Sequence, residues 1–195
     1  SFAAALYELV LLEDFELVGH GGYGHTVDYL DLQKYYVGEV SEHKFKENEF
    51  VVIGAGYPEL RQKIYDELKA RNIRFFTIHL GLPFKESVVV GEANIFVSSF
   101  EPSCNIKIGN NNVFNGDVIV GHDCEIGDCN FFGPRSQVLG GVKVGDFNQI
   151  GANAILLPNC KIGNNNKIAP LSAVYKGCRD NSYWAGNPAV KMGGI

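Results

Sequence analysis

Residues 108–174 read IGNNNVFNGDVIVGHDCEIGDCNFFGPRSQVLGGVKVGDFNQIGANAILLPNCKIGNNNKIAPLSAV. Every sixth residue of this stretch is apolar, without exception: Ile108, Phe114, Val120, Ile126, Phe132, Val138, Val144, Ile150, Leu156, Ile162, Ile168 and Val174. A helix repeats every 3.6 residues and a strand every 2, and neither period explains this spacing. The six-residue repeat is therefore itself the structural unit.

Glycine follows these apolar anchors at seven positions, namely Gly109, Gly121, Gly127, Gly133, Gly145, Gly151 and Gly163. A chain that turns a corner every six residues stacks three short parallel strands per coil, and small residues relieve the corners. The repeat thus predicts a parallel β-helix whose anchors fill the interior. A looser version of the repeat over residues 81–105 indicates that the β-helix begins there, and the regular spacing stops after Val174.

The first 85 residues have a different pattern. Periodicity predicts a helix over 2–12, a strand over 15–18, a strand over 50–56, a helix over 57–72 and a strand over 73–78. The second helix places Leu60, Ile64, Tyr65 and Leu68 on one face. Strand, helix and strand in this order predict a small Rossmann-like α/β domain with a parallel sheet over residues 1–85. The β-helix and a C-terminal tail then occupy residues 86–195.

Glycine turns at the carboxyl ends of parallel strands can bind phosphate through backbone N–H groups. The candidates for substrate binding are Gly19, Gly21, Gly22 and Gly54. The segment GHGGYGH (19–25) is either the loop after the first strand or a later loop of a domain whose first strand lies upstream. A simple tight turn is the structural alternative.

Composition excludes several classes of function. A net charge of −5 over 195 residues argues against a nucleic-acid surface, which clusters Lys and Arg. No apolar window is long enough to span a membrane, and the N-terminus lacks the pattern of a secretory signal, so we expect a cytoplasmic protein. The five cysteines include no CxxC pair, so we expect reduced thiols, with Cys124 and Cys160 buried, and no zinc site.

His122 and Asp123 are the strongest catalytic candidates within the repeat. His122 lies two residues after Val120, so its side chain leaves the coil near a corner, beside an acid that can orient the imidazole of a general base. The adjacent glycines Gly140 and Gly141 expose backbone N–H groups that could bind an oxyanion. The structural alternatives are a solvated His–Asp pair and a turn that requires glycine. Arg135 either meets an anionic ligand or forms a surface ion pair.

Several segments together resemble a known family. They are similar to segments of the hexapeptide acyltransferases of the sialic acid O-acetyltransferase type. The segments are VGHDCEIGDCNFFGP, GGVKVGDFNQIGANAILLPNCKIG, AGNPAVKM, and VVIGAG followed by a helix containing Arg61. This family includes the N-acetyltransferases of nucleotide-linked amino sugars, such as the UDP-4-amino sugars of the bacillosamine pathway. The resemblance covers nearly the whole chain.

The resemblance implies a left-handed β-helix and a homotrimer with acetyl-CoA in a groove between neighbouring β-helices. It implies that His122 is the general base, Asp123 its acidic neighbour, and Gly140 the glycine whose amide faces the thioester carbonyl. The cofactor contacts would come from Gly141, Ala152, Pro170, Pro188 and Lys191. Ala152 and Pro170 would border the pantetheine arm, and Pro188 and Lys191 would lie near the adenine.

The N-terminal domain departs from the family pattern. The family's GxGGH-type loop is matched only by Gly19, Gly21 and Gly22, and its Asp pair only by Asp28 and Asp31. Residues 78–80 read IHL where the family often has IHP. These departures concern the domain that selects the substrate, so they affect the acceptor more than the acyl-transfer step.

We therefore expect direct transfer of acetyl from acetyl-CoA to the amine of a nucleotide-linked amino sugar, without a metal. One alternative is O-acetylation of sialic acid or another glycan hydroxyl. A γ-carbonic anhydrase would need three converging histidines, and the repeat contains only His122. A non-catalytic β-helix scaffold or sugar-binding module is the remaining alternative. The nucleotide, the sugar and the acyl chain length are left open.

Overall fold

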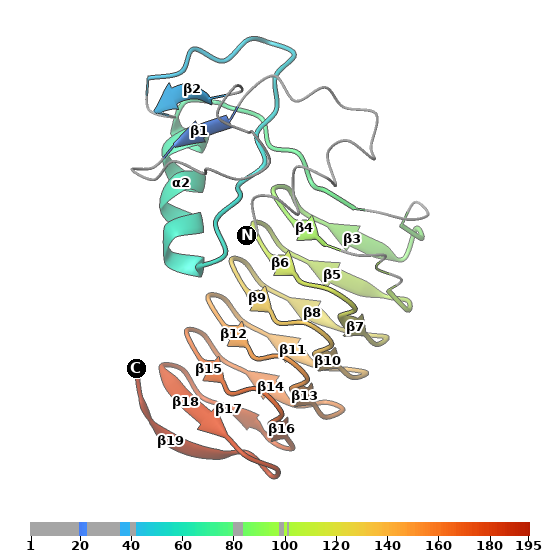
Figure 1. Cartoon of the computed structure of the whole chain (residues 1–195). Coiled ribbons are helices and arrows are strands. Elements are labelled where there is room, and N and C mark those ends of the chain that lie inside the picture. The colour runs from blue at the N-terminus through green and yellow to red at the C-terminus, as the bar shows by residue number, and fades with distance from the viewer. Residues whose placement is uncertain (1–19, 23–35, 40–41, 80–83, 98–99, 101) are drawn as a thin grey trace.

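The computed structural model describes residues 20–22, 36–39, 42–79, 84–97, 100 and 102–195. Figure 1 shows a long column of short strands with helix α2 and two N-terminal strands at one end. The helix predicted over 2–12, the strand over 15–18, and Gly19, Asp28 and Asp31 lie outside the described residues. Gly21 and Gly22 belong to strand β1 (His20–Gly22), which pairs in parallel with β2 (Tyr36–Glu39), so this part of the glycine segment is extended.

The column is a parallel β-helix with three sheets. The four-stranded sheet contains β7 (Ile119–Val120), β10 (Gln137–Val138), β13 (Ile155–Leu156) and β16 (Ala173–Val174). The six-stranded sheet contains β3 (Val88–Val90), β5 (Ile106–Ile108), β8 (Glu125–Ile126), β11 (Lys143–Val144), β14 (Lys161–Ile162) and β17 (Gly177–Cys178). The seven-stranded sheet contains β4 (Ile95–Phe96), β6 (Val113–Phe114), β9 (Phe131–Phe132), β12 (Gln149–Ile150), β15 (Lys167–Ile168), β18 (Ser182–Ala185) and β19 (Val190–Gly194).

One coil contains three six-residue repeats. Lys143 therefore lies opposite Glu125 on one side and Lys161 on the other, each 18 residues away. All twelve predicted anchors are buried, with at most 4% of each residue exposed. Phe114 stacks between Phe96 and Phe132 with ring centroids 4.8 and 4.7 Å apart. The predicted parallel β-helix and its interior are thus confirmed.

The corners between the sheets share one backbone conformation. The residue three positions after each anchor has a positive φ, in the series Asn111, Asp117, Asp123, Cys129, Arg135, Gly141, Phe147, Asn153, Asn159, Asn165, Leu171 and Gly177. Asn105, six residues before the first of these, also has a positive φ. Asn, Asp and Gly predominate in this series because they adopt the left-handed region most readily. Asp123 therefore occupies a corner position that favours Asp for conformational reasons alone.

A ladder of buried asparagines fixes the register of the coils. The ladder consists of Asn94, Asn112, Asn130, Asn148 and Asn166, which are stacked 18 residues apart. Each of the last four donates its side-chain amide to the Oδ1 of the asparagine before it, at 3.0–3.1 Å. Because these amides are buried, they need hydrogen-bond partners, which the neighbouring asparagines and, for Asn94 and Asn112, nearby glycine carbonyl oxygens supply. A coil that slipped by one residue would leave these amides unsatisfied.

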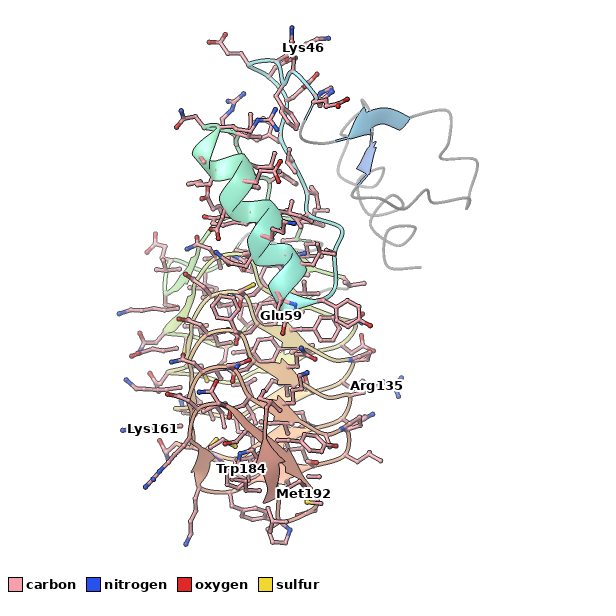
Figure 2. The ribbon with its side chains drawn as sticks, turned by 90° about the vertical axis from the view of Figure 1, so that its left-hand side faces the viewer. Lys46, Glu59, Arg135, Lys161, Trp184 and Met192 are labelled. Carbon is pink, nitrogen blue, oxygen red and sulfur yellow. The ribbon has the colours of Figure 1, made fainter. Side chains whose placement is uncertain are left out.

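The β-helix continues beyond the last regular repeat. Lys161 lies opposite Gly177, so the step to the last coil is 16 residues. The tail then forms β18 and β19, which pair antiparallel and cover the free edge of the seven-stranded sheet. Figure 2 shows Trp184 and Met192 at this C-terminal end, far from α2.

Helix α2 (Pro58–Ala70) packs against the other end of the β-helix. Its buried residues are Pro58, Arg61, Ile64 and Leu68. The predicted face was wrong at Leu60, which is 40% exposed, whereas Arg61 is 1% exposed. The Arg61 guanidinium donates hydrogen bonds to the backbone oxygens of Ile53, Ala55, Ala93 and Asn111, which explains how a charged side chain is tolerated there. Burial lowers the pKa of Arg61 to about 10.

The strands predicted on either side of α2 are reduced to a single bridge. Val51 pairs in parallel with Phe75, through Val51 N–H to Arg74 O (2.9 Å) and Phe76 N–H to Val51 O (3.0 Å). Ile78 then pairs in parallel with Ile95 of β4, so the N-terminal region joins the β-helix through the seven-stranded sheet. Parallel pairing around a helix agrees with the predicted order, and the Rossmann-like domain remains a prediction.

In the part of the chain described, no helix has both the length and the apolar character that crossing a membrane requires.

Candidate functional site

His122 and Asp123 lie at the corner that leads from β7 in the four-stranded sheet to β8 in the six-stranded sheet. The His122 Nδ1 lies 2.7 Å from the Asp123 Oδ2. Because a carboxylate accepts hydrogen bonds, this contact favours the tautomer with the proton on Nδ1 and a free lone pair on Nε2. Both side chains are exposed, at 62% and 54%. Nε2 is thus available to take a proton from a bound molecule.

Gly140 occupies the same corner one coil later, and the His122 ring lies against it. A Cβ placed on Gly140 would be 2.6 Å from His122 Nε2 and 2.8 Å from its Cε1. A Cβ on Gly121 would in turn be 2.8 Å from the Gly140 nitrogen. Both glycines therefore keep the space around the Gly140 N–H open. Gly121 was not among the predicted site residues, although it directly precedes His122.

The two adjacent glycines differ in their hydrogen bonds. The Gly141 N–H donates to the His122 carbonyl oxygen at 2.8 Å, and Gly141 has a φ of +72°. Within the described residues, the Gly140 N–H donates to no backbone or side-chain acceptor. A half-buried, unpaired N–H beside an imidazole can bind a developing oxyanion. Of the two adjacent glycines, Gly140 is therefore the one whose N–H is free to donate a hydrogen bond to an oxyanion.

Hydrogen bonds hold the Asp123 carboxylate in its charged form. Asn105 from the preceding corner donates its side-chain amide to Asp123 Oδ1 at 2.5 Å. This bond, followed by the contact with His122, lowers the pKa of Asp123 below its usual value. Asn105 was not predicted as a site residue, although it precedes Asp123 by 18 residues, which is one full coil.

Cys124 lies next to the pair but is turned into the core. Its Sγ donates to Leu139 O at 3.2 Å and lies 3.5 Å from His122 O. Burial raises the pKa of this thiol, so it is a poor nucleophile. Cys160 is also buried, as predicted, and Cys104 is exposed. In the described residues no three His, Cys, Asp or Glu side chains come together as a metal site.

Two of the predicted cofactor residues lie on another corner of the coil. Ala152 follows β12 and Pro170 follows β15, so both lead from the seven-stranded to the four-stranded sheet. They stack in successive coils, with Leu171 N–H donating to Ala152 O at 2.9 Å. A strand of the four-stranded sheet separates this corner from that of His122. One chain therefore does not bring the two sets together.

Pro188 and Lys191 lie on the exposed tail at the last coil. Ala189 N–H donates to Ala173 O of β16 at 2.8 Å, which attaches the tail to the four-stranded sheet. β16 is three strands away from β7 in that sheet. At the usual strand spacing this is about 14 Å from the His122 coil. An elongated ligand is needed to connect the two places.

Positive charge is concentrated near this end. Residues 156–195 contain five cationic side chains and one acidic side chain, whereas the whole chain has a net charge of −5. Lys161 extends from one edge of the β-helix and Arg135 from the other (Figure 2). Arg135 Nε lies 3.7 Å from Asp117 Oδ2, and both side chains are largely exposed, so this pair is a weak surface contact.

Gly54 lies in the segment before α2 and is exposed. The Arg61 guanidinium donates to the carbonyl oxygens on either side of it, those of Ile53 and Ala55, the latter at 2.9 Å. Arg61 thus fixes the backbone around a predicted substrate-binding glycine and joins it to the β-helix. The sequence indicated only that Arg61 belongs to the helix.

Comparisons with known proteins agree with this architecture. The bacterial transferase hexapeptide family (six repeats) matches residues 141–176. The acetyltransferase domain of PglB from Neisseria gonorrhoeae, in complex with acetyl coenzyme A, is similar with a TM-score of 0.89 and 16% identity, covering 98% of this chain and 95% of that one. No curated protein sequence matches the chain.

Two further solved structures are similar over almost the whole chain. A variant of perosamine N-acetyltransferase from Caulobacter crescentus, in complex with CoA and GDP-perosamine, has a TM-score of 0.86 and 22% identity, covering 99% of this chain and 93% of that one. WeeI from Acinetobacter baumannii has a TM-score of 0.77 and 19% identity, covering 98% and 95%. The predicted resemblance to hexapeptide acyltransferases is confirmed for the repeat and the fold.

Proposed function

We propose that this protein is an acetyl-CoA-dependent N-acetyltransferase that acts on the amine of a nucleotide-linked amino sugar. One observation carries the proposal: the His122 ring, oriented by Asp123 at 2.7 Å, lies against a glycine whose N–H is unpaired. A base and an oxyanion donor in contact are the two groups that acyl transfer from a thioester needs. The similar structures with acetyl-CoA, CoA and GDP-perosamine support the choice of donor and acceptor.

In the proposed reaction the neutral sugar amine attacks the thioester carbonyl carbon. His122 Nε2 takes the proton from the nitrogen, and Asp123 stabilises the imidazolium. The Gly140 N–H binds the oxyanion of the tetrahedral intermediate. The intermediate then collapses by breaking the carbon–sulfur bond, and the imidazolium returns a proton to the departing thiolate. The products are the N-acetyl sugar and CoA with a free thiol.

Direct transfer in a ternary complex is supported by the surroundings of His122. A covalent acetyl-enzyme would need a nucleophile within reach of the base. Cys124 is adjacent in sequence, yet its thiol is buried and donates to backbone carbonyls on the core side. The exposed Cys104 lies one coil before His122, and the described residues include no hydrogen bond between the two side chains. The amine is therefore the group that we propose His122 activates.

A homotrimer is the assembly that we propose, because the cofactor residues are divided between two corners. Ala152 and Pro170 lie across the four-stranded sheet from His122. A groove between two parallel β-helices would place this corner of one chain beside the His122 corner of the next. The cofactor's phosphates would then lie toward the positively charged C-terminal coils, near Lys191 and Pro188.

The acceptor's nucleotide is assigned to the N-terminal region. Gly54 and the glycines at 19, 21 and 22 are the proposed contacts, because backbone N–H groups can bind phosphate in an acidic protein. Gly54 is exposed, and Arg61 fixes the backbone around it.

Four further features remain predictions: the Rossmann-like domain, the left-handed coil, the domain boundary at residue 85 and the cytoplasmic location.

The acceptor is tested by incubating the protein with acetyl-CoA and a panel of UDP-, GDP- and dTDP-linked amino sugars, together with the matching sugars that carry a hydroxyl in place of the amine. Release of the CoA thiol and the mass of the product report the transfer. We expect an N-acetyl product from at least one amino sugar and none from its hydroxyl counterpart. Turnover of hydroxyl acceptors alone would instead establish an O-acetyltransferase, and no turnover of any acceptor would favour a scaffold.

A further inference from the structure

Asn105 hydrogen-bonds to the Asp123 carboxylate, which in turn contacts His122. Its Nδ2 donates to Asp123 Oδ1 at 2.5 Å, while Asp123 Oδ2 lies 2.7 Å from His122 Nδ1. Each oxygen of the carboxylate therefore has its own partner. Asn105, Asp123 and His122 form a continuous hydrogen-bonded series that ends at the base.

The backbone holds the first two members of this series in place. Asn105 and Asp123 occupy equivalent corners of successive coils, with φ values of 54° and 58°. Asp123 N–H donates to Cys104 O at 3.0 Å, which fixes the register between the two corners. Because both side chains start from stacked, conformationally restricted positions, the amide reaches the carboxylate without reorganisation of the chain.

The Asp123 carboxylate is exposed, so it needs Asn105 as a second partner if it is to stay directed at His122. A carboxylate that is 54% exposed can rotate and exchange its contact with His122 for water. A hydrogen bond to the other oxygen restricts that rotation and leaves Oδ2 directed at Nδ1. On the preceding corner the exposed Cys104 adjoins Asn105, Cys124 beside Asp123 is buried, and Gly141 on the following corner has no side chain.

A similar hydrogen bond between stacked corner side chains occurs at a place that is remote from the proposed site. Asn165 donates its Nδ2 to Asn181 Oδ1 at 2.7 Å, at equivalent corners of two later coils. That pair involves neither a carboxylate nor a histidine. Stacking of asparagine at a corner is thus a general structural feature, and the distinguishing feature at Asn105 is its acceptor.

We propose that Asn105 is a positioning residue of the acetyl-transfer site, which holds the Asp123 carboxylate in the orientation that directs it at His122. This inference rests on the proposed function for its catalytic consequence. It assigns a role to a residue one coil away from the base, and it makes the base part of a three-residue unit. The hydrogen bond from Asn105 also favours the charged carboxylate, which is the form that stabilises the imidazolium.

Asn105→Gly is the variant of choice, because glycine keeps the left-handed backbone and removes only the amide. Asn165→Gly is the matched control. We expect Asn105→Gly to lower kcat about fivefold to tenfold with little change in KM. This range is what the loss of one charge-assisted hydrogen bond costs when water partly screens it. The pKa of Asp123, followed by carboxyl carbon NMR, should rise in this variant. Asn165→Gly should leave kcat and the Asp123 titration unchanged.

A double variant establishes that Asn105 acts through Asp123. We expect Asn105→Gly combined with Asp123→Ala to be no slower than Asp123→Ala alone. Additive losses would overturn the inference, as would an Asn105→Gly protein with the kcat and Asp123 titration of the parent. If the parent transfers acetyl to no acceptor, the proposed function fails, while the NMR titration still decides whether Asn105 holds the carboxylate.

Discussion

Gly140→Ala is a sharp test of the site because the structure defines what the new methyl group would meet. The added Cβ would lie 2.6 Å from His122 Nε2, whereas non-bonded atoms of this kind prefer about 3.5 Å. The ring must therefore move by roughly 1 Å. Gly140 is not among the described glycines with positive φ, so alanine causes no backbone strain. His122 is exposed and can turn outward at little cost.

The two consequences of this substitution differ in size. A displacement of about 1 Å at a catalytic group costs on the order of a hundredfold in rate, which corresponds to about 2.7 kcal/mol of transition-state stabilisation. Stability should be unchanged or slightly higher, by up to about 0.5 kcal/mol, since alanine has fewer unfolded conformations than glycine. We therefore expect a folded protein with a much lower kcat.

The assay is the rate of CoA thiol release with a saturating amino sugar, together with the midpoint of urea unfolding. Gly116→Ala is the matched control, because a Cβ there meets nothing within 4 Å. Gly121→Ala is the contrasting variant: its Cβ would be 2.8 Å from the Gly140 nitrogen and 3.0 Å from the Leu139 carbonyl carbon, so it should destabilise the fold. A Gly140→Ala protein with a kcat within threefold of the parent would refute the proposed geometry.

Two other predictions concern the buried groups. Arg61→Leu leaves four backbone oxygens without their donor, so we expect it to lower the free energy of unfolding in urea by about 3 kcal/mol. The exposed neighbour is the control: Leu60→Ala should change this free energy by less than about 0.5 kcal/mol. Equal effects of the two substitutions would contradict the role of Arg61. In a titration of native protein with a chromogenic disulfide reagent at pH 8, we expect only Cys104 of the five cysteines to react, because the other four are buried. For Cys129, burial raises the pKa to about 12, which leaves roughly one part in ten thousand of this thiol as thiolate at pH 8. Two or more fast-reacting thiols would refute this assignment.

The sequence predicts the β-helix well because its period is directly visible. Twelve anchors at one spacing fix which side chains fill the interior, and the coil of three repeats follows from that spacing. The same period places Gly140 one coil after His122, since 18 residues separate them. Asp123 beside His122 needs no folding information at all. These parts of the site depend on local order and on the repeat, both of which can be read along the chain.

The N-terminal region is harder to predict because its contacts are distant in sequence. Helical periodicity favoured Leu60 over Arg61 for the core, and only the carbonyls of Ala93 and Asn111 explain why Arg61 is buried. The apolar segment 50–56 indicated a full strand, yet only Val51 pairs. The contact of Asn105 is hard to predict for a different reason. Asparagine is common at these corners, so its type gives no sign of the carboxylate that it contacts.

The role of His122 is measured by the rate at which a His122→Ala protein releases the CoA thiol in the presence of acetyl-CoA and the amino sugar that the parent acetylates. Because its ring lies against Gly140 and its Nδ1 contacts Asp123, His122 is the residue that we propose as the base of the transfer step. We predict a kcat between about a hundredfold and ten thousandfold below that of the parent, with an unchanged unfolding midpoint. A folded His122→Ala protein that retains more than about a tenth of the parent's kcat would show that His122 is not the base.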